Sequence, residues 1–422
     1  MTIEAQFAAF ALAQPDDAPR DLMRLCLYDW LACGKAGSEE AVARIMRSKS
    51  LEDGGLAAAS LFGGGRVPAQ QAALVNGATS HALDYDDTHF AHIGHTSVVV
   101  ISAALATAEA VGATLDELID ATAVGSEGAI RIGQWLGRNH YQLGFHQTAT
   151  SGAFGAALAA ARLMKLTVPE TVTSLGLCAS MASGIKAQFG TMAKPLNAGL
   201  AAQAGVEAAQ LARLGMSATD AGLRRFSDTH SGIRDEEGLA GLGYEWRISS
   251  ISHKFHACCH GLHPMLEALA LLKLTRQDVG RLIITTHQRW MTVCNLEHPQ
   301  TGLEAKFSYK MTAAMLLAGI DTADIQNFST ETVKDPSLIK IAELIEVRAN
   351  ELMSETGSKV LVQLADGSKA HAKYDVSDPL PMAQRARRIR SKVDSLCGGD
   401  VSQKLWDAAH GADIRIVVET LA

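Results

Sequence analysis

The sequence predicts a mainly α protein in which a large all-helical domain is joined to a smaller α+β domain. The chain has 422 residues and is 47% hydrophobic but only 5% aromatic. Much of this hydrophobic fraction is alanine, and a sequence rich in alanine and poor in aromatic residues favours closely packed helices. Helical spacing and helix-capping pairs recur as far as about residue 250, and β-branched runs appear only after that point.

The composition also excludes several classes of protein. A formal net charge of −7 argues against a nucleic-acid binder, whose domains usually carry a basic excess. The longest apolar run, from Val98 to Ala108, is shorter than the roughly 20 residues that span a bilayer, so we expect no membrane segment. Seven cysteines in so long a chain do not form a disulfide framework, and the first residues lack the cationic start of a signal peptide. These features predict a cytoplasmic protein.

The first part of the chain reads as consecutive helices. Three pairs have the capping-box spacing that marks a helix start, namely Thr114 with Glu117, Thr167 with Glu170, and Ser217 with Asp220. Gly112 and Gly215 fall where the preceding helices should end. The run SGAFGAALAAARLMKL, from residue 151 to 166, predicts a helix in close backbone contact with its neighbours.

The later part changes character. Residues 281–288 and 345–350 read as strands, and two alternating runs around Asp366-Gly367 predict a hairpin with a type I′ turn. Residues 302–320 read as one helix between strands, and a helical pattern returns after residue 382. We therefore expect a helical domain over 1–251, an α+β domain over 252–381, and C-terminal helices over 382–422 that return to the helical domain.

Ionisable residues gather most densely between residues 81 and 97. This segment holds His81, Asp84, Asp86, Asp87, His89, His92 and His95. Carboxylates are rarely buried without a partner, so some of these side chains should pair with one another or face a cleft. A capped helix end followed by a polar loop is the simplest alternative. A metal-dependent hydrolase using Asp84, His89, His92 and His95 is another, although no HExxH or CxxC spacing supports it.

Three further segments place polar groups in apolar or small-residue sequence. Residues 253–263 put Lys254 and His256 beside two cysteines, where the helical part of the sequence gives way to the part with β-branched runs. His146 precedes a helix of alanine and glycine, where free N–H groups can hold an anion, and Lys194 precedes Pro195. Histidines and lysines without a cofactor motif suit proton transfer on a small anionic substrate. A helical protein that binds anionic metabolites without catalysis is the remaining alternative.

Six stretches, in order along the chain, resemble the MmgE/PrpD family. They are NGATSHALDYDDTH, GHTS, GFHQTATSGAFGAA, GTMAKPLNAG, KFHACCHGLH and AKFS, and they run from residue 76 to residue 308. The family includes 2-methylcitrate dehydratase, cis-aconitate decarboxylase and iminodisuccinate epimerase. Each stretch is a weak signal alone, but six in the same order make a specific resemblance.

The resemblance implies a homodimer in which the α+β domain is a lid and the active site lies in the cleft between the two domains, with no metal and no organic cofactor. It implies as site residues Asp84, Thr88, His95, His146, Lys194 and Lys254. His95 and His146 would be general base and acid, Lys194 and Lys254 would hold substrate carboxylates, Asp84 would orient a histidine, and Thr88 would donate to a carboxylate. His256 is a further candidate for substrate binding.

The resemblance also implies a reaction class, namely abstraction of a proton α to a carboxylate of a small di- or tricarboxylate. A hydro-lyase similar to 2-methylcitrate dehydratase is the first expectation; the alternatives are an epimerase of an iminodisuccinate-like acid and a lyase similar to cis-aconitate decarboxylase. The sequence departs from the family where Met311 replaces a frequent tyrosine, with Tyr309 nearby, and where Thr96 replaces the proline of GHPS. Both departures favour the epimerase over the dehydratase.

Overall fold

The computed structural model describes residues 1–230 and 232–422, and the chain divides into two compact units. The first unit runs from Met1 to His253 and resumes from Cys397 to Ala422. The second unit runs from Lys254 to Leu396. The predicted fold class is confirmed, because helices dominate the first unit and a small sheet occurs in the second.

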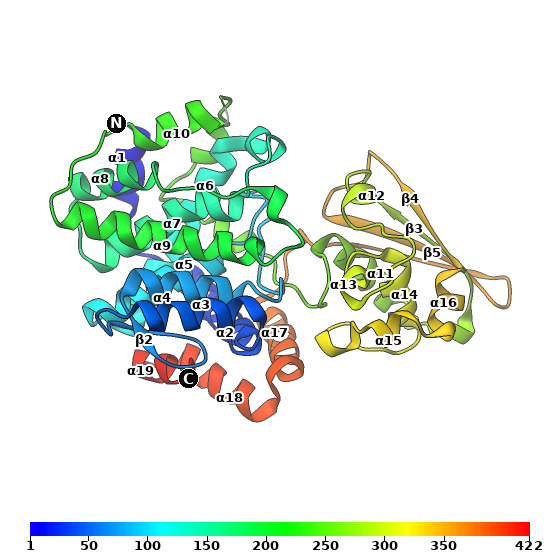
Figure 1. The fold of residues 1–422 in the computed structure, drawn as a ribbon. Coiled ribbons are helices and arrows are strands. Elements are labelled where there is room, and N and C mark those ends of the chain that lie inside the picture. The colour runs from blue at the N-terminus through cyan, green and yellow to red at the C-terminus, as the bar shows by residue number, and fades with distance from the viewer. Residues whose placement is uncertain (231) are drawn as a thin grey trace. The chain divides into compact units, whose positions relative to one another are not determined.

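The first unit is built from helices that lie side by side (Figure 1). They are α1 (Ile3–Phe10), α2 (Asp17–Gly37), α3 (Ala41–Asp53), α4 (Ala69–Ser80), α5 (Ser97–Val111), α6 (Leu115–Gln142), α7 (Gln147–Leu163), α8 (Val168–Cys178), α9 (Ala193–Arg213), α10 (Gly222–His230), α18 (Gly399–His410) and α19 (Ile414–Glu419). A two-stranded antiparallel hairpin, β1 (Ala59–Ser60) with β2 (Arg66–Val67), turns through the glycines at 63–65.

Glycines allow the central helices of this unit to touch through their backbones. A Cβ added at Gly155 on α7 would lie 2.5 Å from the carbonyl oxygen of Gly125 on α6. A Cβ added at Gly199 on α9 would lie 2.2 Å from the carbonyl oxygen of Leu74 on α4. The predicted close backbone contact of the small-residue helix is therefore confirmed, and it explains why a core of this size needs few aromatic residues.

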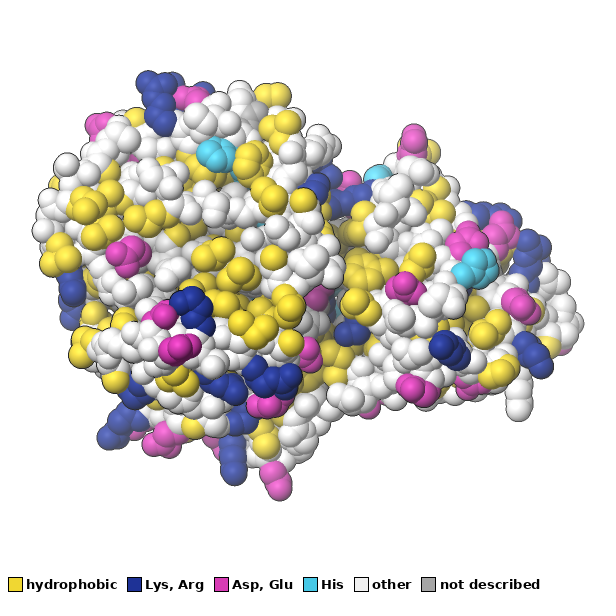
Figure 2. Space-filling view, in the orientation of Figure 1, with side chains coloured by type: hydrophobic (Ala, Val, Ile, Leu, Met, Phe, Trp, Pro, Cys, Tyr) yellow, Lys and Arg dark blue, Asp and Glu magenta, His cyan; other side chains and the backbone are white. Residues whose placement is uncertain are grey.

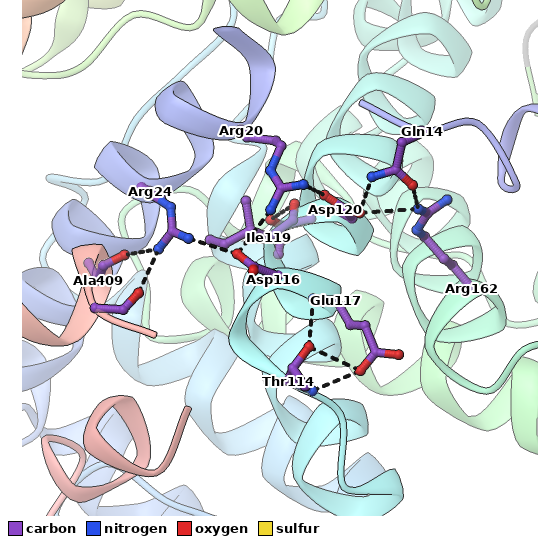
Figure 3. A network of polar contacts seen from close by, with 12 residues as sticks. Gln14, Arg20, Arg24, Thr114, Asp116, Glu117, Ile119, Asp120, Arg162 and Ala409 are labelled. Atoms are coloured by element: carbon purple, nitrogen blue, oxygen red, sulfur yellow. Dashed lines mark hydrogen bonds and ion pairs between the residues drawn. The ribbon is translucent and has the colours of Figure 1, made fainter. Parts of the chain in front are cut away.

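Polar side chains fix the helix ends at the edge of this unit (Figure 3). The predicted capping boxes at Thr114–Glu117 and Thr167–Glu170 are both present, and Gly112 ends α5 in the left-handed conformation. Asp116 on α6 pairs with Arg20 and Arg24 of α2, each at 2.9 Å. Arg24 also donates to the carbonyl oxygen of Ala409, which ties the C-terminal segment to α2.

The second unit contains a four-stranded sheet in the order β4-β3-β5-β6. Its strands are β3 (Val279–Thr286), β4 (Ile345–Ala349), β5 (Gly357–Leu364) and β6 (Lys369–Asp375), and only the β3–β4 pair is parallel. Helix α11 (His263–Leu271) packs on β5 and β6, while α14 (Tyr309–Leu317) packs on α11 and α16 (Pro336–Ala342) (Figure 1). Short helices α12 (Trp290–Val293), α13 (Gly302–Ala305) and α15 (Thr330–Val333) connect these elements.

Three local predictions were wrong. The helix predicted over 302–320 is two helices, because Ser308 leaves the helical conformation and caps α14 by accepting the Met311 N–H. The helix predicted to start at Ser217 begins at Gly222. The hairpin exists, but its turn is not type I′: only Gly367 has a positive φ, and the Asp366 carboxylate accepts the N–H and hydroxyl of Ser368 across a longer loop.

The second unit extends further than the 252–381 expected from the sequence. Helix α17 (Met382–Cys397) groups with it as far as Leu396 rather than with the returning C-terminal helices. Arg388 on α17 pairs with Glu267 of α11 and lies 4.0 Å from the ring centroid of Phe255. Among the described residues, none of the helices combines the length and the apolarity that a membrane crossing requires.

The glycine contacts predict that adding a side chain at such a glycine lowers the free energy of unfolding. Replacing Gly155 with alanine should destabilise the protein by about 1–3 kcal/mol, because neither backbone can yield easily, even though alanine favours a helix by roughly 1 kcal/mol. The matched control is Gly399→Ala, since an added Cβ at this first residue of α18 meets nothing within 4 Å. Urea unfolding of both variants tests this, and equal stabilities would contradict the close-packing argument.

Candidate active site

The polar segment 81–97 leaves α4 at its C-cap, His81, and enters α5. Asp87 anchors its far end, because its carboxylate accepts the N–H of Ser97 at 3.2 Å and also the Ser97 hydroxyl. A carboxylate in this position is favoured by the positive end of the helix dipole. Asp84 adopts φ +51°, a left-handed conformation that non-glycine residues rarely take and that is frequent at functional sites.

Two histidines share one buried carboxylate in this segment. Asp86 Oδ1 lies 2.8 Å from His81 Nδ1, and Asp86 Oδ2 lies 2.8 Å from His95 Nδ1. The second contact has a poor hydrogen-bond angle, so the distance between the two atoms defines it. The rings of His81 and His95 meet edge to face with centroids 4.5 Å apart.

Lys194 brings a positive charge to the same cluster. It lies at the start of α9, and its ammonium is 2.8 Å from Asp84 Oδ1. The same oxygen is 3.4 Å from His95 Nε2. The Asp84 side chain is 37% exposed, whereas those of Lys194 and His95 are 14% and 12% exposed. The cluster is therefore reached from the Asp84 side.

His146 completes the group at the start of α7. Its ring stacks with that of His81 at 6.3 Å and meets Phe189 edge to face at 5.0 Å. Its Nδ1 lies 3.4 Å from the Asn197 amide nitrogen, one turn along α9 from Lys194. The sequence-predicted residues Asp84, His95, His146 and Lys194 thus come together, although they span more than a hundred residues of chain.

Burial sets the charge states of these histidines. It lowers the pKa of His95 to about 4, against the opposing effect of Asp86. Burial and the nearby Lys194 ammonium hold the pKa of His146 well below 6.5. Burial alone would raise the pKa of Asp86, but the two imidazoles together outweigh it and hold this pKa well below 3.8. At neutral pH the cluster therefore has a charged Asp86 beside neutral His95 and His146 rings.

Two histidines of the segment serve packing instead. His92 Nε2 pairs with the Ser151 hydroxyl at 2.7 Å, and His89 Nε2 lies 3.2 Å from the carbonyl oxygen of Arg247. The set imagined for a metal-dependent hydrolase is thus not assembled. Within the described residues, Asp84 and His95 gather with His81 and Asp86 instead. The Lys194 ammonium supplies a positive charge beside the Asp84 carboxylate of this group.

The remaining sequence-predicted residues are Thr88, Lys254 and His256. Thr88 pairs through its backbone with Ser252 in the first unit. Lys254 and His256 belong to the second unit. Both ring nitrogens of His256 are engaged there, with the Thr322 hydroxyl at 2.7 Å and Glu267 at 3.1 Å.

The resemblance to the MmgE/PrpD family suggests a tyrosine at position 311, and the side chains at and near this position are buried. Met311 is 4% exposed. Tyr309 is fully buried, and its hydroxyl bonds with the carbonyl oxygen of Gly261 and the hydroxyl of Thr286. Tyr309 is thus committed within the second unit.

Sequence reasoning missed two members of the site, His81 and Asp86. Both were visible in the dense 81–97 cluster, but no pattern there separated them from His89, His92 and Asp87. Only the folded structure distinguishes them, because the chain folds back so that the Asp86 carboxylate lies beside the rings of both His81 and His95.

Comparison with known proteins identifies matching families along most of the chain. The MmgE/PrpD N-terminal domain matches residues 5–227, and the MmgE/PrpD C-terminal domain matches residues 256–410. A cis-aconitate decarboxylase from Aspergillus terreus is 26% identical over 94% of this chain and 90% of its own length. The human cis-aconitate decarboxylase is 32% identical over 67% of this chain and 62% of its own length.

The buried histidines predict that stability falls in mild acid. His89, His95 and His140 have pKa values lowered by burial to about 4, and that of His92 is lowered to about 3. Between pH 6.5 and 4 the unfolded chain takes up protons that the folded chain does not, so folding stability is full above pH 6.5 and is lost as pH falls. Burial raises the pKa of Asp87 to about 6 and also raises the pKa of Glu127, so these two carboxyl groups oppose the trend.

Thermal unfolding at pH 7.5 and pH 5.0 measures this effect directly. We expect a lower midpoint at pH 5.0, and His92→Gln should reduce the difference because this ring carries the largest of the four pKa shifts. A midpoint that is constant or higher at pH 5.0 would show that these rings are not buried in neutral form.

Proposed function

This chain belongs to the MmgE/PrpD enzyme family, and we propose that it is a lyase that removes carbon dioxide from a small unsaturated tricarboxylate of the cis-aconitate type. Fungal and mammalian relatives that match it are cis-aconitate decarboxylases, which supports decarboxylation over the dehydration expected first from the sequence. The observation that carries the proposal is the meeting of the Lys194 ammonium and the neutral ring of His95 at the partly exposed Asp84 carboxylate, with the neutral ring of His146 stacked on His81 in the same cluster.

The proposed reaction needs a cation and a proton carrier. When a carboxylate allylic to the double bond leaves as carbon dioxide, one C–C bond breaks and its electron pair moves into the unsaturated system. A proton must then be added to the carbon at the far end of that system. We assign Lys194 to a substrate carboxylate, where its charge stabilises the electron pair that develops. We assign His95 or His146 to delivery of the proton.

Substrate binding prepares both roles. Asp84 pairs with the Lys194 ammonium at 2.8 Å, so a substrate carboxylate must take the place of Asp84 there. The added negative charge raises the proton affinity of the neighbouring rings, since an opposite charge within about 4–6 Å favours the charged imidazole. A ring that is neutral before substrate binds then becomes an acid in the complex.

Two further assignments rest on the sequence resemblance. Lys254 stays a candidate for a second substrate carboxylate, and Thr88 stays a candidate hydrogen-bond donor.

We also propose that the protein is a homodimer. Figure 2 shows apolar side chains over the face of the first unit that carries α3, α4 and α9, and exposed hydrophobic residues on these helices include Ile45, Leu51 and Leu200. Such a surface supports self-association.

A substrate panel tests the reaction. Purified protein is incubated in deuterium oxide with cis-aconitate, 2-methylcitrate or iminodisuccinate and followed by NMR. We expect carbon dioxide release from the cis-aconitate-type acid with one deuterium placed on carbon, and unchanged turnover after dialysis against EDTA. Water loss from 2-methylcitrate would favour the dehydratase, deuterium exchange without bond cleavage would favour the epimerase, and activity lost with EDTA would contradict a metal-free mechanism.

Lys194→Met tests the carboxylate assignment. Loss of the ammonium should lower kcat/KM by roughly 10²–10³-fold, because the developing charge is left without its cation. The matched control is Lys165→Met, a lysine whose side chain is 81% exposed and pairs only loosely with Glu117. Comparable kinetics for both variants would remove Lys194 from the site.

A further inference from the structure

His81 stands out among the buried polar groups of the first unit. Its side chain is fully buried, and its ring meets that of His95 edge to face and stacks with that of His146. Its Nδ1 is 2.8 Å from Asp86, while its Nε2 is buried and has no hydrogen-bond partner among the described residues. A buried imidazole nitrogen without a partner carries a cost that packing alone does not explain.

We propose that Asp86 and His81 are positioning residues of the active site, in which the Asp86 carboxylate fixes the orientation and tautomer of His95, and His81 restrains the proton affinity of His95 by competing for the same carboxylate. This proposal deepens the acid–base function proposed above and concerns the same site. It assigns both residues a role through His95 rather than a contact with substrate.

The tautomer follows from the chemistry of a carboxylate. An ionised carboxylate only accepts hydrogen bonds, so a ring nitrogen 2.8 Å away is stable there only if it carries a proton. His81 therefore donates its Nδ1–H to Asp86, and His95 keeps its Nδ1 proton beside the same carboxylate although the angle of that contact is poor. In the neutral ring of His95 the lone pair is then left on Nε2, the nitrogen that faces Asp84 and lies on the accessible side of the cluster.

The proton affinity of His95 follows from the groups that face it. From the 81–97 segment these are His81, Asp84, Asp86 and His92, and from the starts of α9 and α7 they are Lys194 and His146. Asp86 raises the pKa of His95, whereas His81 and Lys194 lower it. Removing Asp86 and removing His81 should therefore change His95 in opposite directions.

The decisive measurement is a titration of His95 by NMR in protein labelled with ¹⁵N-histidine. In Asp86→Asn we expect the midpoint of His95 to fall below pH 4 and one of the two rings to lose its Nδ1 proton, because an amide cannot accept from both. In His81→Asn we expect the midpoint to rise by about one pH unit, a tenfold gain in proton affinity. A role in folding alone would not produce opposite shifts.

The matched control is Asp87→Asn. Asp87 is the adjacent buried carboxylate, and the side-chain oxygen of an asparagine in its place can still accept the N–H of Ser97. Because burial raises the pKa of Asp87 to about 6, it is already neutral at the pH where His95 titrates, and the replacement should leave His95 where it is. Shifts of the same sign in the Asp86 and His81 variants, or an unchanged His95 in either, would overturn the proposal.

Kinetics form the second arm. Asp86→Asn should reduce kcat about 10²-fold or more with a smaller change in KM, and the pH at which kcat/KM changes should move in opposite directions in the two variants. If Asp86→Asn does not fold, His81→Asn decides, and an unshifted His95 then overturns the proposal. The NMR arm needs no substrate, so a wrong reaction class would leave the opposite shifts intact and affect only the kinetic arm.

Discussion

The close approach of helix backbones in the first unit is the constraint on which the site depends. Gly205 on α9 lies against the backbone of Ala157 on α7, and Gly199 on α9 lies against the backbone of Leu74 on α4. These contacts set how far the end of α4, the start of α7 and the start of α9 lie from one another. His81, His146 and Lys194 stand at those three helix ends. A helix pair held one methyl group further apart would separate the rings and the ammonium that define the cluster.

A single buried negative charge organises the chemistry within that frame. Asp86 is 1% exposed, and such a charge is stable only when opposite charge or hydrogen-bond donors surround it. Its two imidazole partners meet that need, and in return their Nδ1 positions are occupied. Asp84 differs because it is partly exposed and pairs with Lys194. Two carboxylates two residues apart thus have different partners, since Asp86 lies between two imidazole rings and Asp84 pairs with an ammonium.

Much of the fold could be predicted from sequence because its signals are local. Capping boxes at Thr114 and Thr167, the stop at Gly112 and the β-branched runs all act within a few residues. The break at Ser308 and the turn at Asp366 escaped prediction because a single side chain there accepts a backbone N–H in place of the regular pattern.

The site was predicted through a resemblance of six ordered stretches, which pointed to Asp84, His95, His146 and Lys194. It could not supply His81 and Asp86, since a histidine that restrains another ring looks the same in sequence as His92, which packs against Ser151. The separation of these roles depends on where α4 ends and how the chain returns to α5.

The neutral state of the buried rings has a thermodynamic consequence for ligand binding. A site that meets a polyanion with uncharged imidazoles must draw protons from the solvent as the complex forms. The measured heat of binding then includes the ionisation heat of the buffer, and affinity weakens as the solution becomes more alkaline. The enzyme would thereby respond to cellular pH through binding itself, before any bond of the substrate is broken.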